Sequence, residues 1–120
     1  MIQDENPIET PSVSSSEKSN EHLVNYLEVK KASAILRAIN HKLRQGIIKL
    51  LDEKDQITVT EIFIALRIEQ SVASQHLAIL RRAEFVNTIR EGKNIMYSLN
   101  KEKIIQLNNF VKKLLDTKEN

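Results

Sequence analysis

The stretch SVASQHLAILRRAEFV, residues 71–86, decides the fold. Its apolar residues recur at three- and four-residue steps, which predicts a helix over residues 71–83 that buries Leu77 and Leu80. The polar side chains between them then fall on the opposite face of the helix. The phenylalanine and valine that close the stretch indicate that the chain passes directly from this helix into a strand.

A shorter helix is predicted just before this stretch. Thr58 and Glu61 have the spacing of a capping box, Thr60 is also a suitable N-cap, and the apolar residues that follow continue to Leu66. Residues 56–60 are too few for a strand that stands alone. Two short helices joined by a tight turn form a helix-turn-helix, in which the second helix can enter the major groove of DNA.

The pattern changes from the helical to the strand period after the quoted stretch. Residues 86–99 alternate around the turn Glu91-Gly92-Lys93-Asn94, where Gly92 can supply a positive φ. This predicts a β-hairpin, and a basic hairpin that follows a helix-turn-helix is a wing. The predicted fold class is therefore mainly α with a small β-hairpin, a winged helix-turn-helix.

Amphipathic helices are predicted on both sides of this motif. The first runs from about Asn20 to residue 39, and the second covers about residues 41–53, with Gly46 inside it. The last helix is capped by Asn100 and runs for about 15 residues. The first and last helices are more apolar than a monomer of this size requires.

Composition narrows the classes of function. The 120 residues include no cysteine and only two glycines, which excludes thiolate metal sites, cysteine nucleophiles and glycine-rich phosphate loops. No apolar run approaches the roughly 20 residues of a membrane span, so no membrane partner is expected. Residues 1–25 carry a net charge of −4 and the remainder carries +6. A basic body favours a polyanionic partner.

The chain is divided into a leader and one domain. Residues 1–19 are rich in serine with two prolines, offer little to bury, and are predicted to form a flexible acidic leader. Residues 20–117 are predicted to form the winged-helix domain. Because the first ten residues are acidic and lack an apolar stretch, we expect no secretion signal and a cytoplasmic location.

The motifs occur in a characteristic order over about residues 30–115. They are His41-x-x-Arg44-x-x-Ile47-Ile48-x-Leu50-Leu51, Val59-Thr60-Glu61-Ile62, Ser71-x-x-Ser74-Gln75-His76-Leu77-x-x-Leu80-Arg81-x-Ala83 with Phe85-Val86, Arg90-Glu91-Gly92-Lys93, and Tyr97-Ser98-Leu99. This ordered set resembles the ArsR-type (arsenic-repressor-like) winged helix-turn-helix transcriptional regulators.

The resemblance implies a homodimer that is joined through its first and last helices and reads an inverted repeat in double-stranded DNA. The interface residues that it implies are Leu23, Leu27, Ile104, Leu107, Val111 and Leu114. The stripe on the last helix also fits a second interpretation, in which it belongs to the core of the monomer. Only the resemblance and the apolar first helix favour the dimer.

The resemblance does not extend to a metal site. Members that sense metals place thiolates near the third helix, or carboxylate and imidazole ligands on the last helix. The matching positions here hold Thr58, Thr60 and Phe63, and then Lys101 and Lys103. These side chains do not make a site for a divalent cation. No metal and no other cofactor are predicted, and no effector ligand is assigned.

The predicted DNA-binding residues lie on the second motif helix and on the hairpin. Glutamine can pair with adenine through two hydrogen bonds, serine can bond bases or phosphate, and a basic wing tip can reach phosphate. These residues are Gln70, Ser71, Ser74, Gln75, His76, Arg81, Arg90, Lys93 and Asn94. The alternatives are a solvated helix face, stabilisation of the helix end by Arg81 and Arg82, and protection of a sheet edge by charge.

Two of the basic residues keep alternative roles. His76 is either a phosphate contact or pH switch, or a half-buried imidazole whose hydrogen bond orients the helix, and we favour the second. Arg44 is either part of a buried ion pair or a DNA contact, and both interpretations stay open.

Together these patterns predict a dimeric, sequence-specific DNA-binding regulator. We expect a repressor that reads an inverted-repeat operator with helix 71–83 in the major groove and the 86–99 hairpin as wing. The alternative is a winged-helix module that binds protein, because one fold serves both uses. An enzyme is not expected, since the sequence shows no nucleophile–base set and no metal ligands.

Overall fold

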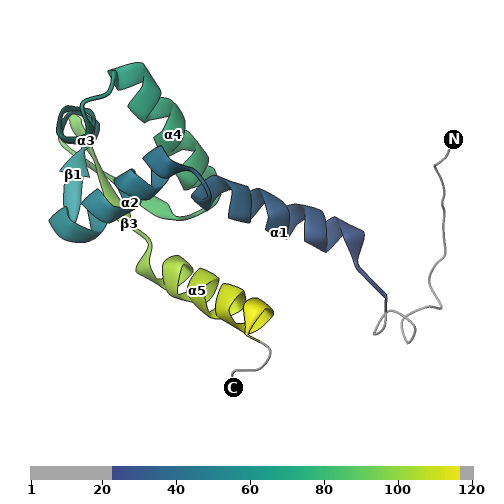
Figure 1. The fold of residues 1–120 in the computed structure, drawn as a ribbon. Coiled ribbons are helices and arrows are strands. Elements are labelled where there is room, and N and C mark those ends of the chain that lie inside the picture. Colours follow the sequence, from purple (N-terminus) through teal and green to yellow (C-terminus); the bar gives the residue numbers. More distant parts are fainter. Residues whose placement is uncertain (1–22, 117–120) are drawn as a thin grey trace, which may run out of the picture. The chain divides into compact units, whose positions relative to one another are not determined.

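The computed structural model describes residues 23–116 (Figure 1). Its elements, in order, are α1 (Tyr26–Ile39), α2 (Lys42–Lys54), β1 (Gln56–Thr58), α3 (Val59–Leu66), α4 (Gln70–Arg82), β2 (Val86–Glu91), β3 (Asn94–Leu99) and α5 (Lys101–Leu115). This order confirms the predicted winged helix-turn-helix. The leader assigned to residues 1–19 lies outside the described residues. The chain forms two units, one up to Ser33 and one from Ala34 onward.

The described part of the first unit is the start of α1. The helix begins at Tyr26, because the Asn25 side chain accepts a hydrogen bond of 3.1 Å from the backbone N–H of Glu28 and caps it. Leu23 therefore precedes the helix, whereas the apolar pattern of the sequence places it inside. The predicted start near Asn20 lies outside the described residues.

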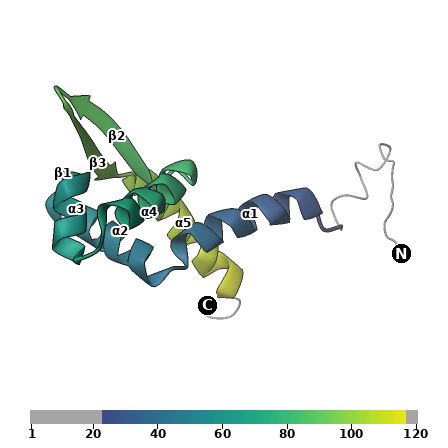
Figure 2. The ribbon, with the colours of Figure 1, turned by 90° about the horizontal axis from the view of Figure 1, so that it is seen from above.

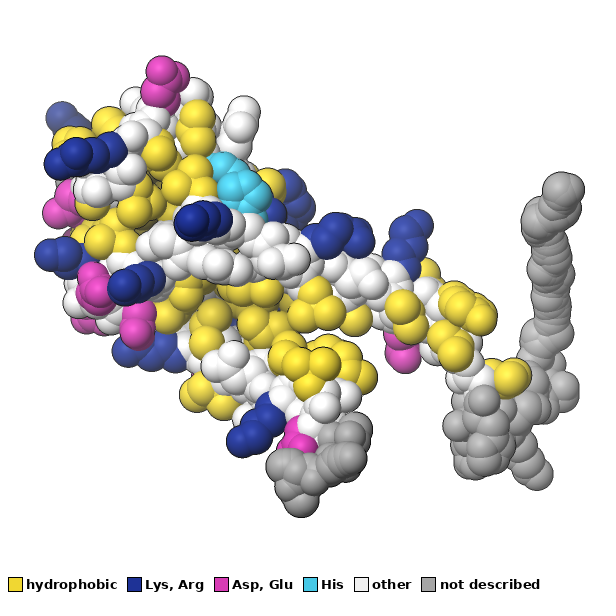
Figure 3. All heavy atoms as spheres, viewed as in Figure 1, with side chains coloured by type: hydrophobic (Ala, Val, Ile, Leu, Met, Phe, Trp, Pro, Cys, Tyr) yellow, Lys and Arg dark blue, Asp and Glu magenta, His cyan; other side chains and the backbone are white. Residues whose placement is uncertain are grey.

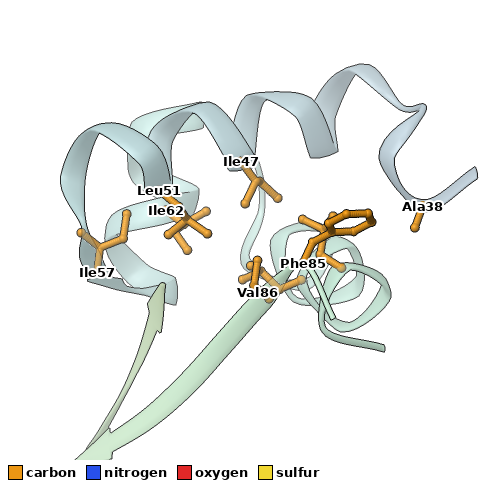
Figure 4. Packing of buried hydrophobic residues seen from close by; sticks show 9 residues of the cluster. Ala38, Ile47, Leu51, Ile57, Ile62, Phe85 and Val86 are labelled. Atoms are coloured by element: carbon orange, nitrogen blue, oxygen red, sulfur yellow. The ribbon is translucent and has the colours of Figure 1, made fainter. Parts of the chain in front are cut away.

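The core of the second unit is built around α2 (Figure 4). Ile47 and Leu51 of α2 point toward Phe85 and Val86, which follow α4. The buried apolar residues are Ala38, Ile47, Leu51, Ile57, Ile62, Ala73, Leu77, Leu80, Phe85 and Val86. Each large apolar side chain buried in this way stabilises the fold by about 1.5–3 kcal/mol. The predicted inner face of the motif helix, with Leu77 and Leu80, is confirmed.

Side-chain caps also determine where α2 and α3 start. Thr58 is the N-cap of α3, with its side chain bonded to the N–H of Glu61 at 3.2 Å and the Glu61 carboxylate bonded to the Thr58 N–H at 2.9 Å. The capping box is thus confirmed, and Thr60 lies inside the helix. His41 is the N-cap of α2, because its Nδ1 accepts from the N–H of Leu43 at 3.1 Å. The helix therefore starts one residue later than the predicted range, which includes His41.

The three strands form one antiparallel sheet in the order β1-β3-β2. The three residues of β1 do not stand alone, because they pair with β3, where Ile57 faces Tyr97. On the other side of β3, Thr88 of β2 faces Tyr97. Figure 2 shows β2 and β3 extending from the helices as a hairpin. Its turn contains Gly92 at φ +64, which confirms the predicted wing.

The turn between α3 and α4 is made by side-chain-bearing residues. Arg67 ends α3 in the left-handed conformation at φ +59, and its N–H bonds to the carbonyls of Ile64 and Phe63. Glycine adopts this conformation at lower cost, since it has no Cβ. Glu69 is the N-cap of α4 but makes no side-chain cap bond. The helix begins at Gln70 and ends at Arg82, one residue earlier at each end than predicted.

Candidate nucleic-acid interface

Helix α4 has one face in the core and one face in solvent. Ala73, Leu77 and Leu80 are buried, whereas Ser74 and Gln75 are exposed. The buried face comes from apolar residues at helical spacing, as the sequence indicated. Anchoring by these residues fixes which polar side chains α4 presents to a ligand.

The exposed side chains of α4 keep their hydrogen-bonding groups free. Within residues 23–116, the side chains of Gln70, Ser71, Ser74, Gln75 and Arg81 make no hydrogen bond or ion pair. All five are exposed. The structure therefore brings the predicted α4 residues together on one accessible surface, with the exception of His76, which is half-buried.

The predicted wing residues lie at the tip of the hairpin. Arg90 faces Ile95, and Asn94 faces Glu91 across the turn, which Gly92 and Lys93 form. All of these side chains are exposed. Because β2 is an edge strand, its charges also protect the sheet edge against pairing with another strand. The acidic Glu91 beside Arg90 lowers the net positive charge of the tip.

A cleft separates α4 from the wing. It is lined by Ser74, Leu77, Ala78, Arg81 and Arg82 of α4 and by Tyr97 of β3, and its volume is about 400 Å³. Tyr97 is not among the predicted site residues. No sequence motif indicates that a residue of β3 lies beside α4, some twenty residues earlier in the chain. The register of the hairpin, in which Val86 faces Leu99, together with the strand period places Tyr97 on the same sheet face as the buried Val86.

His76 is held by a partner from another helix. Its Nδ1 lies 3.1 Å from Nη1 of Arg44, and its ring lies 4.7 Å from that of His41, measured between centroids. Figure 3 shows histidine side chains (cyan) at the surface of the second unit. Because a guanidinium can only donate, the His76 Nδ1 accepts, and the ring is neutral with its proton on Nε2. The structure thus agrees with the orienting role favoured for His76.

Arg44 closes the end of α1. A helix leaves its last four carbonyls without an intrahelical partner. The Arg44 Nε donates to the Ala38 carbonyl at 2.6 Å and its Nη2 donates to the Arg37 carbonyl at 3.1 Å. The Leu36 carbonyl accepts from the N–H of Asn40. The Ile39 carbonyl accepts from the N–H of His41 and from Gln45 Nε2. Arg44 is 9% exposed and makes no ion pair with another described residue, so the buried ion pair is not found, whereas the DNA contact stays a prediction.

Electrostatics favour the neutral form of His76. Partial burial, followed by electrostatic interactions with His41 and then Arg44, lowers the pKa of His76 below its usual value. Both of these neighbours lie at the start of α2. Protonation of Nδ1 would turn an accepted hydrogen bond into a repulsive contact with Arg44.

The residues assigned to a dimer interface occupy different environments. Leu23 and Leu27 are 63% and 62% exposed, and Leu114 is 61% exposed. Ile104 and Leu107 are half-buried and pack against the protomer's own core, as in the second interpretation of the stripe, and Val111 is half-buried too. Apolar side chains are visible over the exposed part of α5 in Figure 3. Val24, Val29, Ile105, Phe110 and Leu115, which were not assigned to the interface, are exposed as well.

The described residues offer little to a metal ion. Over residues 23–116 no three His, Cys, Asp or Glu side chains come together as ligands. In the same part of the chain, no helix has the length and apolar character needed to cross a membrane.

Comparison with known proteins agrees with this geometry. The family model described as "Bacterial regulatory protein, arsR family" matches residues 41–88, which run from the N-cap of α2 into β2. The transcriptional repressor PagR of Bacillus anthracis is 30% identical over 84 residues, which cover 70% of this chain and 84% of PagR. The transcriptional activator HlyU of Vibrio cholerae is 35% identical over 74 residues, which cover 62% of this chain and 68% of HlyU.

Solved structures show the same architecture. HlyU from Vibrio cholerae aligns with a TM-score of 0.58 at 30% identity over 75% of this chain and 97% of that one. PagR of Bacillus anthracis aligns with a TM-score of 0.58 at 28% identity over 72% of this chain and 99% of that one. The fold, the exposed polar surface of α4 and the similar proteins all indicate the same family. The chain belongs to the arsR family of bacterial regulatory proteins and is a winged helix-turn-helix DNA-binding transcriptional regulator, not an enzyme.

Proposed function

We propose that this chain is a homodimeric repressor that reads an inverted-repeat operator, with α4 in the major groove and the β2–β3 hairpin as wing. The observation that carries the proposal is the exposed face of α4, where hydrogen-bonding side chains without partners stand opposite a face anchored in the core. A helix that is rigid on one side and free on the other is suited to reading base edges.

The α4 side chains divide by chemistry. Ser74 and Gln75 carry the direct base contacts, since an amide can bond the N6 and N7 positions of adenine together. Gln70 and Ser71 lie at the start of the helix, where backbone N–H groups attract phosphate. His76 positions α4 through Arg44 rather than reading bases.

Three basic residues and one asparagine supply the contacts that do not depend on sequence. Arg81, at the end of α4, and Arg90, Lys93 and Asn94, at the wing tip, are exposed and contact phosphate in the proposed complex. The basic balance of the chain after its first 25 residues supports this role.

The exposure of α5 supports a dimer. Leu107 packs on the core of its own protomer, whereas Leu114, two turns further along the same face, is 61% exposed. An apolar face that extends beyond its own core is covered when a second copy pairs with it. Two α4 helices related by a two-fold axis then contact half-sites about one DNA turn apart, roughly 34–36 Å.

The proposal includes repression rather than activation of transcription. The relatives include a repressor and an activator. Repression needs only occupancy of DNA, whereas activation also needs a surface for the transcription machinery. We therefore propose repression by the domain of residues 20–117. With DNA as the partner, the location is the cytoplasm.

Selection of bound duplexes from a random pool tests the proposal. An inverted repeat should be enriched, and Gln75→Ala should weaken its binding by about 1–3 kcal/mol for each base that is no longer contacted, while relaxing the preference at one position in each half-site. Gln106→Ala changes an exposed glutamine on α5 and should leave binding unchanged. Failure to enrich any sequence would instead favour the protein-binding module.

A further inference from the structure

The cleft between α4 and the wing gathers donors that the protein itself does not use. Ser74, Arg81 and Arg82 of α4 line one side, and Tyr97 of β3 lines the other. Within residues 23–116, none of these four side chains makes a hydrogen bond or an ion pair. Hydroxyl and guanidinium groups are the donors that proteins use for phosphate oxygens.

Tyr97 is the most rigidly held of the four. Its strand is the central one of the sheet, so its backbone lies between Ile57 of β1 and Thr88 of β2. Its ring is half-buried and packs against the core. Because the ring is fixed there, the hydroxyl is the part of the side chain that can extend into the cleft. The hydroxyl makes no hydrogen bond to another described residue, so it is available to a ligand in the cleft.

In the proposed function, DNA occupies the space between α4 and the wing, and the inference below rests on that function. The major groove and the neighbouring minor groove of DNA are separated by one sugar–phosphate backbone. A protein that places α4 in the first and its hairpin at the second straddles that backbone. The backbone must then run between α4 and the wing, where the cleft lies.

We propose that this cleft is a channel for the sugar–phosphate backbone and that the Tyr97 hydroxyl donates a hydrogen bond to a phosphate oxygen inside it. Arg81 contributes a charged contact to the same backbone, whereas the tyrosine contact is neutral. The two contacts therefore have different signatures. Removal of a cationic contact makes the salt dependence of binding shallower, because fewer counterions are released, and removal of a neutral contact does not.

Tyr97→Phe tests the proposal, since it removes the hydroxyl and keeps the ring. The selected operator and a random duplex should both bind roughly tenfold more weakly or worse, with an unchanged slope of log affinity against log salt. Arg81→Gln should weaken both duplexes and make that slope shallower by about 0.9 for each phosphate that the arginine no longer neutralises. Tyr26→Phe, the same change at a 78% exposed tyrosine of α1, should alter neither affinity nor slope.

A phosphate scan locates the contact. Neutral methylphosphonates are placed singly along the operator, and each duplex is titrated with wild type and with Tyr97→Phe. At one phosphate in each half-site, the two losses of affinity should be less than additive, because both changes remove the same bond. Additive losses at every position would overturn the proposal.

The other possible results of these experiments also test the proposal. Equal affinities of wild type and Tyr97→Phe would overturn the phosphate contact while leaving the proposed function intact. A loss confined to the operator would make Tyr97 a base reader, and a lower melting temperature would show that its hydroxyl serves the fold. If the wild type binds no duplex at any salt concentration, the proposed function fails first and this inference fails with it.

Discussion

Replacement of Arg44 by methionine should destabilise the protein far more than replacement of an exposed arginine. Arg44 is 9% exposed, and its guanidinium bonds the carbonyls of Arg37 and Ala38 and the ring of His76. Methionine has similar length but no donor, so the substitution leaves two carbonyls and one imidazole nitrogen without a partner. A buried polar group left in this state costs about 1–3 kcal/mol.

The sum of these losses sets the expected magnitude. The Ala38 carbonyl bond is buried, whereas the other two bonds are only partly buried and their groups recover some hydration. We therefore expect the free energy of unfolding to fall by about 3 kcal/mol. For a domain of this size that corresponds to a drop in Tm of roughly 12–24 °C. Arg44→Lys keeps the charge but not the planar fork, so its loss of stability should be intermediate.

Urea titration followed by circular dichroism measures the effect, at one fixed protein concentration because a dimer is expected. Arg37→Met is the matched control, because the Arg37 side chain is exposed and has no partner within residues 23–116. It should change stability by less than about 0.5 kcal/mol. If Arg44→Met lost no more stability than that control, the guanidinium would not be what closes α1 and joins it to α4.

Three further substitutions probe other features of the structure. The free energy of unfolding should fall as the pH decreases below about 6.5, the pKa of a histidine in the unfolded chain. The pKa of His76 is lower than this in the folded protein, so the unfolded chain binds more protons in this pH range. His76→Asn, which keeps an acceptor near the Nδ1 position, should flatten this dependence in denaturant titrations from pH 8 to 5. Leu114→Glu should leave the protomer folded but monomeric in sedimentation, since this side chain is 61% exposed in the protomer. A dimer that persisted would contradict the α5 interface. Asn108→Glu, at an exposed polar residue of the same helix, is the control and should leave the dimer intact. Gly46→Ala should stabilise the protein by about 0.5–1 kcal/mol, because alanine favours the helix more than glycine does. The new Cβ would lie 3.9 Å from Leu66 Cδ2, which is an ordinary van der Waals contact. A lower Tm in thermal melts would show that the packing of α2 against α3 needs the glycine.

Local chemistry made much of the fold predictable. The capping box of Thr58 and Glu61, the cap at Asn100 and the glycine turn at Gly92 each act over a few residues, so their signals are complete in the sequence. The alternation of buried and exposed positions along α4 follows in the same way from helical period. For this reason the sequence is sufficient to identify the polar face with Ser74 and Gln75.

Boundaries were less predictable where one residue decides them. Asn25 caps α1 by a single hydrogen bond, and an apolar pattern that begins earlier gives no sign of it. His41 serves as an N-cap although Ser, Thr, Asp and Asn are the usual residues there. Three-residue β1 exists as a strand because β3 pairs with it, which is a property of the sheet and not of the segment.

The amino-acid sequence by itself thus determined the order of elements, the inner face of α4 and the class of ligand, since periodicity, caps and charge are local quantities. Only the tertiary structure decided that Arg44 joins the end of α1 to His76, 32 residues away, that Leu107 packs on its own core, and that Tyr97 faces the cleft beside α4. Such contacts join residues whose separation follows no helical or strand period. They arise when packed elements bring distant side chains together, and the chain carries no local signal of which partner each will meet.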